Sequence, residues 1–257
     1  MNLLIDIGNT NLRWASQEGP GIGAPQSVRH GGGAPIDLLA AWDGLAVPHR
    51  VLIGNVGGEA VGTAVARVVR ALWGLEPEVA VTRTECLGVR VAYRDPSRLG
   101  VDRWLVLLAA HARQAGAVLI VDAGTAVTYD LLLADGTHLG GLILPGIEMM
   151  RAGLFAGTRI SRPVPDAVID QGMNETSAAD PWGSDTATAI ALGSVQALGA
   201  LADRLYDRLA ERGQGPGPAI LLTGGDASRL AGVISRPCEL VPDLVLQGLA
   251  RLAGDNP

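Results

Sequence analysis

Short apolar runs that lead into an aspartate and a glycine-containing turn recur along this chain. Asn2 to Ile7 has the apolar content of a β-strand, Gly8-Asn9-Thr10 is typical of a turn, and Asn11 to Ala15 predicts a second strand. The same order recurs where the strand predicted at Ala117 to Asp122 is followed, after a Gly-Thr turn, by another at Val127 to Leu133. The pattern predicts two β-hairpins, each with an aspartate beside its turn, and suggests an internal duplication.

Helical periodicity separates these hairpins from the other predicted strands. From Glu59 to Trp73 apolar residues recur at intervals of three and four positions, which indicates an amphipathic helix. Loops are expected at Gly19 to Gly33 and Tyr93 to Gly100. Further helices are expected at Ile36–Trp42, Asp102–Ala115, Ser184–Ala210, Ala227–Val233 and Asp243–Leu252, and further strands at Val51–Ile53, Glu78–Val81 and Ala219–Thr223. Alternating strands and helices predict an α/β protein.

Composition excludes several classes of function. The 257 residues, 48% of them apolar, are enough for two modest domains. No segment reaches the roughly 18 uncharged apolar residues that span a bilayer, and the first residues lack the pattern of a signal peptide. We therefore expect a cytoplasmic protein without membrane association. A formal net charge of -6 and the absence of a basic run argue against nucleic-acid binding.

The titratable residues narrow the possible chemistry further. Two distant cysteines, Cys86 and Cys238, and four scattered histidines show no metal-ligand spacing, so we expect reduced thiols and no zinc site. All 20 cationic side chains are arginine. The missing lysine excludes the P-loop lysine, the protein-kinase lysine and a Schiff base. ATP, if bound, must therefore be bound by another architecture.

The two hairpin turns carry the residues that phosphate binding needs. Glycine in a turn lets backbone N–H groups approach a phosphate closely, a threonine hydroxyl can donate to it, and an aspartate can hold Mg²⁺. For the segment Asp6 to Thr10 alone, an ordinary hairpin turn is the favoured explanation, because such turns are common. The second copy, Asp122-Ala123-Gly124-Thr125, favours a polyphosphate held from two sides.

This pair of turns resembles the phosphate-1 and phosphate-2 loops of the superfamily of acetate and sugar kinases, heat-shock chaperones and actin. Thr223-Gly224-Gly225-Asp226-Ala227 resembles the adenosine motif of the same superfamily. The resemblance implies an α/β fold of two ribonuclease-H-like (actin-like) domains with a nucleotide cleft between them. We expect the boundary near residue 116, which gives domains 1–116 and 117–257.

Within that superfamily the chain resembles type III pantothenate kinases over nearly its whole length. Tyr93-Arg94-Asp95-Pro96, followed by Leu99 to Trp104, resembles the family's pantothenate loop. Gly140-Gly141 with Pro145-Gly146 is similar to its dimer-interface motif, and Asp185 to Ile190 to its Asp-Thr-x-x-Ala-Ile helix start. The resemblance implies ATP-dependent phosphorylation of pantothenate to 4'-phosphopantothenate, the first step of coenzyme A biosynthesis.

The resemblance also implies roles for single residues. Asp102 would be the catalytic base, and a positioned carboxylate can accept the proton of an alcohol during phosphoryl transfer; it can also cap the helix that follows. Arg103 would bind substrate or phosphate, or would form a surface ion pair. Tyr93 and Thr186 would contact pantothenate, or would serve core packing and an N-cap respectively. The implied substrate-binding set is Tyr93, Gly100, Val101, Asp102, Arg103 and Thr186.

For the cofactors, the resemblance implies ATP, Mg²⁺ positioned by Asp6 and its turn, and a monovalent cation, K⁺ or NH₄⁺, at Asp122. A homodimer is also implied; the apolar run Leu142-Ile143-Leu144 fits an interface, although a buried strand explains it as well. The implied ATP-binding set is Asp6, Ile7, Gly8, Asn9, Thr10, Asn11, Leu12, Arg13 and Thr125.

Two departures from the family pattern stand out. Arg13 replaces the lysine of many members, which keeps the charge but changes its geometry. Gly54-Asn55-Val56 replaces a Ser-Ser-Val, a change expected to alter contacts beneath the pantothenate site without touching the phosphoryl-transfer residues. Two other functions compete: a sugar or acetate kinase on the same fold, and a regulatory relative without catalysis. The short chain argues against the first, and retention of Asp102 with Arg103 argues against the second.

Overall fold

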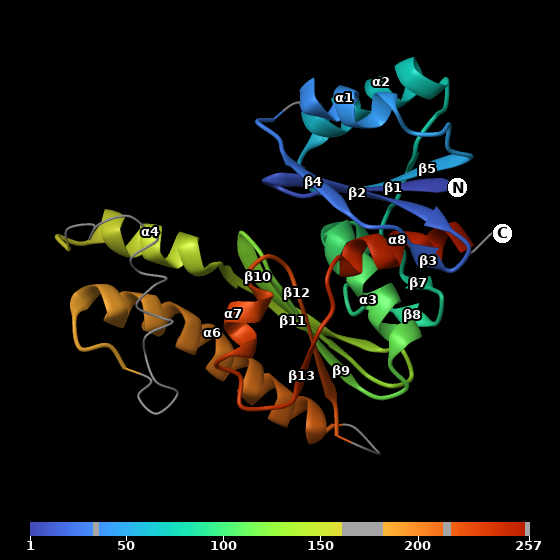
Figure 1. Cartoon of the computed structure of the whole chain (residues 1–257). Coiled ribbons are helices and arrows are strands. Elements are labelled where there is room, and N and C mark those ends of the chain that lie inside the picture. The colour runs from blue at the N-terminus through green and yellow to red at the C-terminus, as the bar shows by residue number, and fades with distance from the viewer. Residues whose placement is uncertain (33–35, 161–181, 213–216, 255–257) are drawn as a thin grey trace. The chain divides into compact units, whose positions relative to one another are not determined.

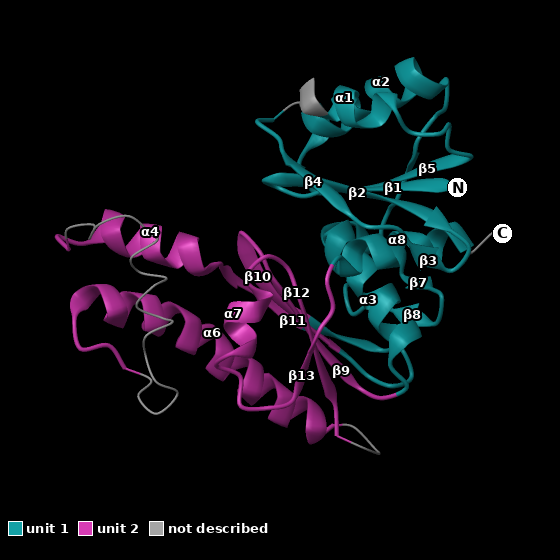
Figure 2. Ribbon diagram, viewed as in Figure 1, with its two compact units in different colours: residues 1–115, 132–140, 243–257 teal, residues 116–131, 141–242 magenta. Residues whose placement is uncertain are grey.

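The computed structural model describes residues 1–32, 36–160, 182–212 and 217–254. They form two compact units, coloured separately in Figure 2. Unit 1 comprises Met1–Ala115, Leu132–Gly140 and Asp243–Pro257, and unit 2 comprises Gly116–Leu131 and Gly141–Pro242. Among the described residues, no helix has the length and apolarity that crossing a bilayer requires.

The main sheet of unit 1 has the strand order β3-β2-β1-β5-β6, with β4 also paired to β2. The β1–β2 hairpin is antiparallel, with Ile7 opposite Leu12 and Asp6 opposite Arg13, whereas β5 runs parallel to β1. The strands are β1 (Asn2–Ile7), β2 (Asn11–Glu18), β3 (Gly21–Ile22), β4 (Gln26–Arg29), β5 (Arg50–Asn55) and β6 (Glu78–Val79).

Helices cover both faces of this sheet (Figure 1). Alternate residues of β1, namely Leu3, Ile5 and Ile7, pack with α1 (Ile36–Asp43) and α2 (Glu59–Trp73) in one buried cluster. On the other face lie α3 (Val101–Arg113) and α8 (Leu244–Gly254), which pack against each other and against β5. A small β7–β8 hairpin (Glu85–Cys86, Val89–Arg90) and a 3₁₀ turn, η1 (Pro96–Arg98), precede α3.

Unit 2 repeats this plan. Its sheet has the order β11-β10-β9-β12-β13, so a hairpin again precedes a strand that runs parallel to the first one. This shared order agrees with the predicted internal duplication. The strands are β9 (Val118–Ala123), β10 (Ala126–Leu132), β11 (His138–Pro145), β12 (Ala219–Thr223) and β13 (Cys238–Leu240), and the helices are α4 (Ile147–Gly157), α6 (Thr186–Ala210) and α7 (Ala227–Ala231).

The α/β class and both hairpins are confirmed, and α2 has the predicted bounds. Gly19 to Gly33 was expected to be a loop, but as far as residue 32 it contains β3 and β4, because pairing with β2 outweighs its glycine and proline content. The helix α4 and the strand β13 were not predicted. The buried-strand explanation of Leu142 and Ile143 is wrong, since these side chains are 43% and 62% exposed on β11.

Candidate functional site

The first phosphate-type turn closes through a hydrogen bond from Gly8 N–H to the Asn11 carbonyl, 3.0 Å long. The preceding Ile7 carbonyl accepts the N–H groups of Val56 (2.8 Å) and Gly57 (3.0 Å), from the loop that follows β5. The turn is thus held from behind by a neighbouring loop, while Asn9 at its tip is exposed.

The loop that holds this turn contains one of the two family departures. Asn55 closes the loop itself: its Oδ1 accepts Gly57 N–H at 3.0 Å and its Nδ2 donates to the Gly58 carbonyl at 3.1 Å. Val56 and Gly57 also donate their backbone N–H groups to Ile7, so Asn55 stabilises the loop that supports the first turn.

Asp102 lies beside the same loop. Its helix, α3, begins at Val101 with Gly100 as N-cap, so Asp102 is not the N-cap; its Oδ1 accepts the Arg103 N–H at 2.8 Å. A Cβ added to Gly100 would lie 2.5 Å from Asp102 Oδ1 and 4.0 Å from Val56 Cγ1. Glycine at position 100 therefore leaves room for the Asp102 carboxylate and lies close to Val56 of the loop that supports the first turn.

Arg103 and Tyr93 form a second contact next to Asp102. Arg103 is 6% exposed, which rules out the surface ion pair considered above. Its Nη1 donates to Tyr93 Oη at 3.0 Å, and its guanidinium carbon lies 5.9 Å from the centroid of the tyrosine ring. The Tyr93 ring also stacks on His138, with ring centroids 6.4 Å and planes 5° apart. No motif in the sequence marks His138.

Arg13, the second family departure, pairs with a residue that no sequence motif marks. Its Nη1 lies 3.1 Å from Asp243 Oδ1. Asp243 precedes α8 and has a positive φ of 55°, which costs strain in a residue other than glycine. Arg13 lies opposite Asp6 on the β1–β2 hairpin, so this ion pair links the hairpin to the start of α8.

The turn in unit 2 has a matching construction. Gly124 N–H donates to the Ala126 carbonyl at 3.0 Å, and Asp226 N–H donates to the Ala123 carbonyl at 2.9 Å. Gly224, with φ 91°, lies where an added Cβ would be 2.6 Å from Asp122 Oδ1. A side chain there would displace the carboxylate predicted to bind a cation, so glycine is required for both conformation and space.

Thr186 is the first residue of α6 and is exposed. The N-cap is Asp185 rather than Thr186, so the capping role considered for the threonine is wrong. Asp185 Oδ1 accepts N–H groups of Ala187 (2.8 Å) and Thr188 (3.0 Å). The hydrogen bonds from the Thr188 N–H and hydroxyl hold the pKa of Asp185 below its ordinary value.

Asp6 and Asp122 each present a carboxylate beside a phosphate-type turn, one in unit 1 and one in unit 2. Over the ranges that the structure describes, no three His, Cys, Asp or Glu residues gather in a metal-binding group. Single carboxylates suit cations that keep water or phosphate oxygens among their ligands, as Mg²⁺ does in phosphate sites.

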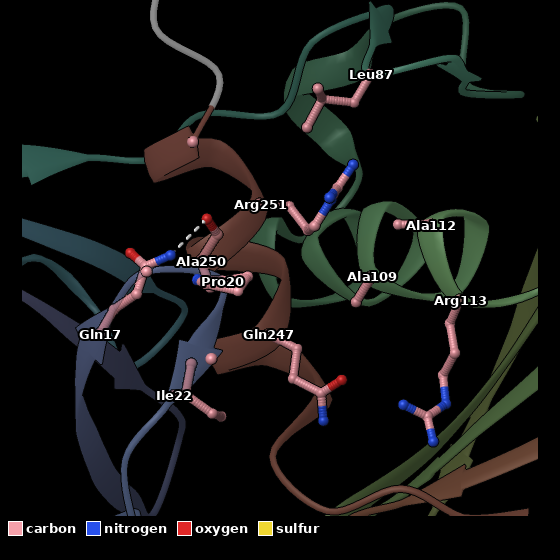
Figure 3. A pocket seen from close by; sticks show the side chains of 13 residues that line it. Gln17, Pro20, Ile22, Leu87, Ala109, Ala112, Arg113, Gln247, Ala250 and Arg251 are labelled. Atoms are coloured by element: carbon pink, nitrogen blue, oxygen red, sulfur yellow. Dashed lines mark hydrogen bonds between the residues drawn. The ribbon is translucent and has the colours of Figure 1, made fainter.

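Unit 1 also has a cavity of about 690 Å³, between the β2–β3 turn and the helices α3 and α8 (Figure 3). Arg113, Arg251 and Gln247 line it. On one wall, Gln17 Nε2 donates to the Ala250 carbonyl at 3.1 Å. None of the predicted site residues lines this cavity, so it is separate from the groups described above.

The repeated hairpin-and-parallel-strand plan is the fold of actin-like ATPases and sugar kinases. Solved structures agree. A Baf-family protein of Campylobacter jejuni has a TM-score of 0.57 at 19% identity, covering 99% of this chain and 98% of its own. A candidate N-acetylmannosamine kinase of Listeria monocytogenes has a TM-score of 0.55 at 13% identity, with 99% of both chains covered.

Sequence relatives specify the family. A type III pantothenate kinase of Nitrosococcus oceani is 38% identical, covering 100% of this chain and 95% of its own, and one of Aromatoleum aromaticum is 36% identical, covering 100% and 99%. The model of the type III pantothenate kinase family matches residues 2–208. The chain belongs to the type III pantothenate kinase family.

Proposed function

We propose that the protein transfers the γ-phosphoryl group of ATP to the primary alcohol of pantothenate, giving 4'-phosphopantothenate for coenzyme A biosynthesis. The observation that carries this proposal is the position of Asp102. In a chain of this kinase family, its carboxylate lies at the start of α3, next to the Tyr93–Arg103 contact and beside the loop that supports the first turn.

In the proposed reaction, Asp102 accepts the proton of the attacking hydroxyl. Phosphoryl transfer depends mainly on positioning and on stabilising charge, so the base has only to orient the alcohol and take up its proton. The first turn of α3, where backbone N–H groups favour negative charge, keeps this carboxylate in place. Arg103, buried and fixed by Tyr93, supplies a cation for the substrate or the transferring phosphate. Gly100, Val101 and Thr186 complete the proposed pantothenate contacts.

The proposed ATP site uses both turns. Residues Asp6 to Arg13 would bind the phosphates from unit 1, and Thr125 would do so from unit 2. Mg²⁺ held near Asp6 would neutralise phosphate charge when bound. Asp122, whose carboxylate adjoins Gly224, is the proposed ligand of the monovalent cation, K⁺ or NH₄⁺. Hard carboxylate oxygen suits such an ion.

The proposal extends to organisation. Along the sequence, the two proposed actin-like ATPase domains are 1–116 and 117–257; segments 132–140 and 243–257 of the second belong to unit 1, where α8 packs on α3 and β1. A homodimer is supported by the exposed apolar side chains of Leu142 and Ile143 on β11. The cytoplasm is the proposed compartment, because Cys86 and Cys238 are not joined in a disulfide, as is usual in a reducing compartment.

An acceptor panel in an ADP-release assay tests this function against its competitors. With ATP, Mg²⁺ and K⁺, we expect turnover with pantothenate and none with glucose or acetate. Turnover with a sugar alone would select another kinase of the same fold. Nucleotide binding without turnover on any acceptor would select a regulatory relative.

A further inference from the structure

His30 contacts the first phosphate-type turn at two places. It directly follows β4, which pairs with β2 so that Arg29 lies opposite Asn11. Its backbone N–H donates to the Thr10 carbonyl at 3.1 Å, and its ring Nε2 lies 2.8 Å from the Gly8 carbonyl. The residue is 8% exposed, so the ring is packed within unit 1.

The partners of the ring fix its hydrogen-bonding state. A carbonyl oxygen only accepts, so Nε2 carries the proton that is donated to Gly8. Nδ1 lies 3.4 Å from the Gly32 N–H, which only donates, so Nδ1 faces it with its lone pair. The Gly32 contact thus orients the ring, and the ring donates to the Gly8 carbonyl and fixes the direction of that carbonyl.

A fixed carbonyl also fixes the N–H of the same peptide. The peptide unit is planar and trans, so the Gly8 carbonyl and the Asn9 N–H point in opposite directions. With the Gly8 carbonyl held toward His30, the Asn9 N–H points away from it. Asn9 is the exposed tip of the turn, where a phosphate would be bound.

The backbone contact of His30 with the Thr10 carbonyl has a counterpart in the second turn. There the Thr125 carbonyl accepts the backbone N–H of Gly146, the residue that follows β11, at 3.0 Å. His30 holds the corresponding position in unit 1, after β4, and adds its ring bond to Gly8. The first turn therefore has a side-chain contact that can be altered while the residues of the turn are left unsubstituted.

We propose that His30 is a positioning residue for the nucleotide: it fixes the Gly8–Asn9 peptide so that the Asn9 N–H faces the phosphates of ATP. This inference rests on the proposed function for the identity of the ligand. It assigns His30 to nucleotide affinity rather than to the acceptor or the chemical step.

Two substitutions of similar polarity separate this role from simple packing. His30→Gln places an amide nitrogen near the position of Nε2 and keeps the donor to Gly8, whereas His30→Asn is too short to reach it. Loss of a hydrogen bond to a buried carbonyl predicts that the Asn variant raises KM for ATP about tenfold, while the Gln variant stays within about threefold of wild type. KM for pantothenate should change by less than about twofold in both.

A control variant at an exposed histidine and a direct binding measurement accompany these kinetic constants. His49 is exposed, so His49→Asn should leave both KM values unchanged. The dissociation constant of a non-hydrolysable ATP analogue, measured by calorimetry, should follow KM for ATP in each variant.

If the Gln and Asn variants bind the analogue equally well, or if KM for pantothenate rises as much as KM for ATP, the inference is wrong. If the wild type binds the analogue in a His30-dependent way but phosphorylates no pantothenate, the proposed function fails and the role of His30 stands.

Discussion

At the scale of single residues, the account depends on the Asp102 carboxylate being both held and available. Its Oδ1 accepts one N–H of α3, and an added side chain at Gly100 would crowd it. A carboxylate has about four lone-pair sites, and the hydrogen bond from Arg103 N–H takes one of them. The capping role weighed from the sequence is wrong, because Gly100 rather than Asp102 is the N-cap, and the catalytic role is the one proposed here.

Replacement of Asp102 by Asn tests this division of roles. Asp102→Asn keeps an oxygen for the Arg103 N–H but removes the proton acceptor, so kcat should fall at least about a hundredfold with an unchanged melting temperature. Steady-state kinetics and thermal unfolding check this. Asp135→Asn, at an exposed turn, is the matched control and should retain full turnover. Near-normal kcat for Asp102→Asn would reject Asp102 as base.

The site residues that could be predicted from the sequence are those that lie within a recognisable motif. Asp102 and Tyr93 stand in such stretches, and the structure brings Tyr93 to Arg103. His30, His138 and Asp243 were not predicted, because each acts through a partner that only folding brings near: Gly8, Tyr93 and Arg13 respectively. A lone histidine in a sequence has no periodicity that would reveal such a contact.

At the scale of elements, a helix or strand could be predicted where its own sequence pattern stabilises it, and not where it depends on pairing with another strand. The helix α2 has the predicted bounds because its apolar residues recur every three or four positions. These residues include Val61, Val65 and Val69, which are buried. The edge strands β3 and β4 are short, and their existence depends on hydrogen bonds to β2. Local propensity does not report such pairing.

The packing of α1 on the sheet of unit 1 gives a prediction of stability. Trp42 is fully buried, stacked on Trp73 at 5.5 Å and edge-on to Trp14 at 6.0 Å. Trp42→Ala would leave a large cavity and should lower the free energy of unfolding by about 3–5 kcal/mol. Urea unfolding followed by circular dichroism measures this. Trp182→Ala is the control: its side chain is 68% exposed, so the change should stay within about 0.5 kcal/mol. Equal effects of the two substitutions would contradict the described core.

At the scale of the whole molecule, the repeated strand order gives each unit its own turn and its own carboxylate. The duplication was visible in the sequence because both hairpins keep the aspartate and glycine. The exchange of segments 132–140 and 243–257 into unit 1 was not visible, since it depends on contacts such as that of α8 with α3.

The proposed homodimer predicts the effect of a charge on β11. Ile143→Glu places a carboxylate within the exposed apolar pair, and burial of an unpaired charge opposes association. Sedimentation should show a dimer for the wild type and a monomer for Ile143→Glu. Val47→Glu alters another apolar side chain, 65% exposed, and should remain dimeric. A monomeric wild type, or dissociation by both substitutions alike, would count against this interface.

The most direct test of the central claim is the identity and amount of the product. Phosphorus NMR and mass spectrometry of a reaction with ATP, Mg²⁺, K⁺ and pantothenate should show one 4'-phosphopantothenate for each ADP, with phosphate on the primary alcohol. ADP formed without phosphorylated pantothenate, or a phosphate at another position, would contradict the account.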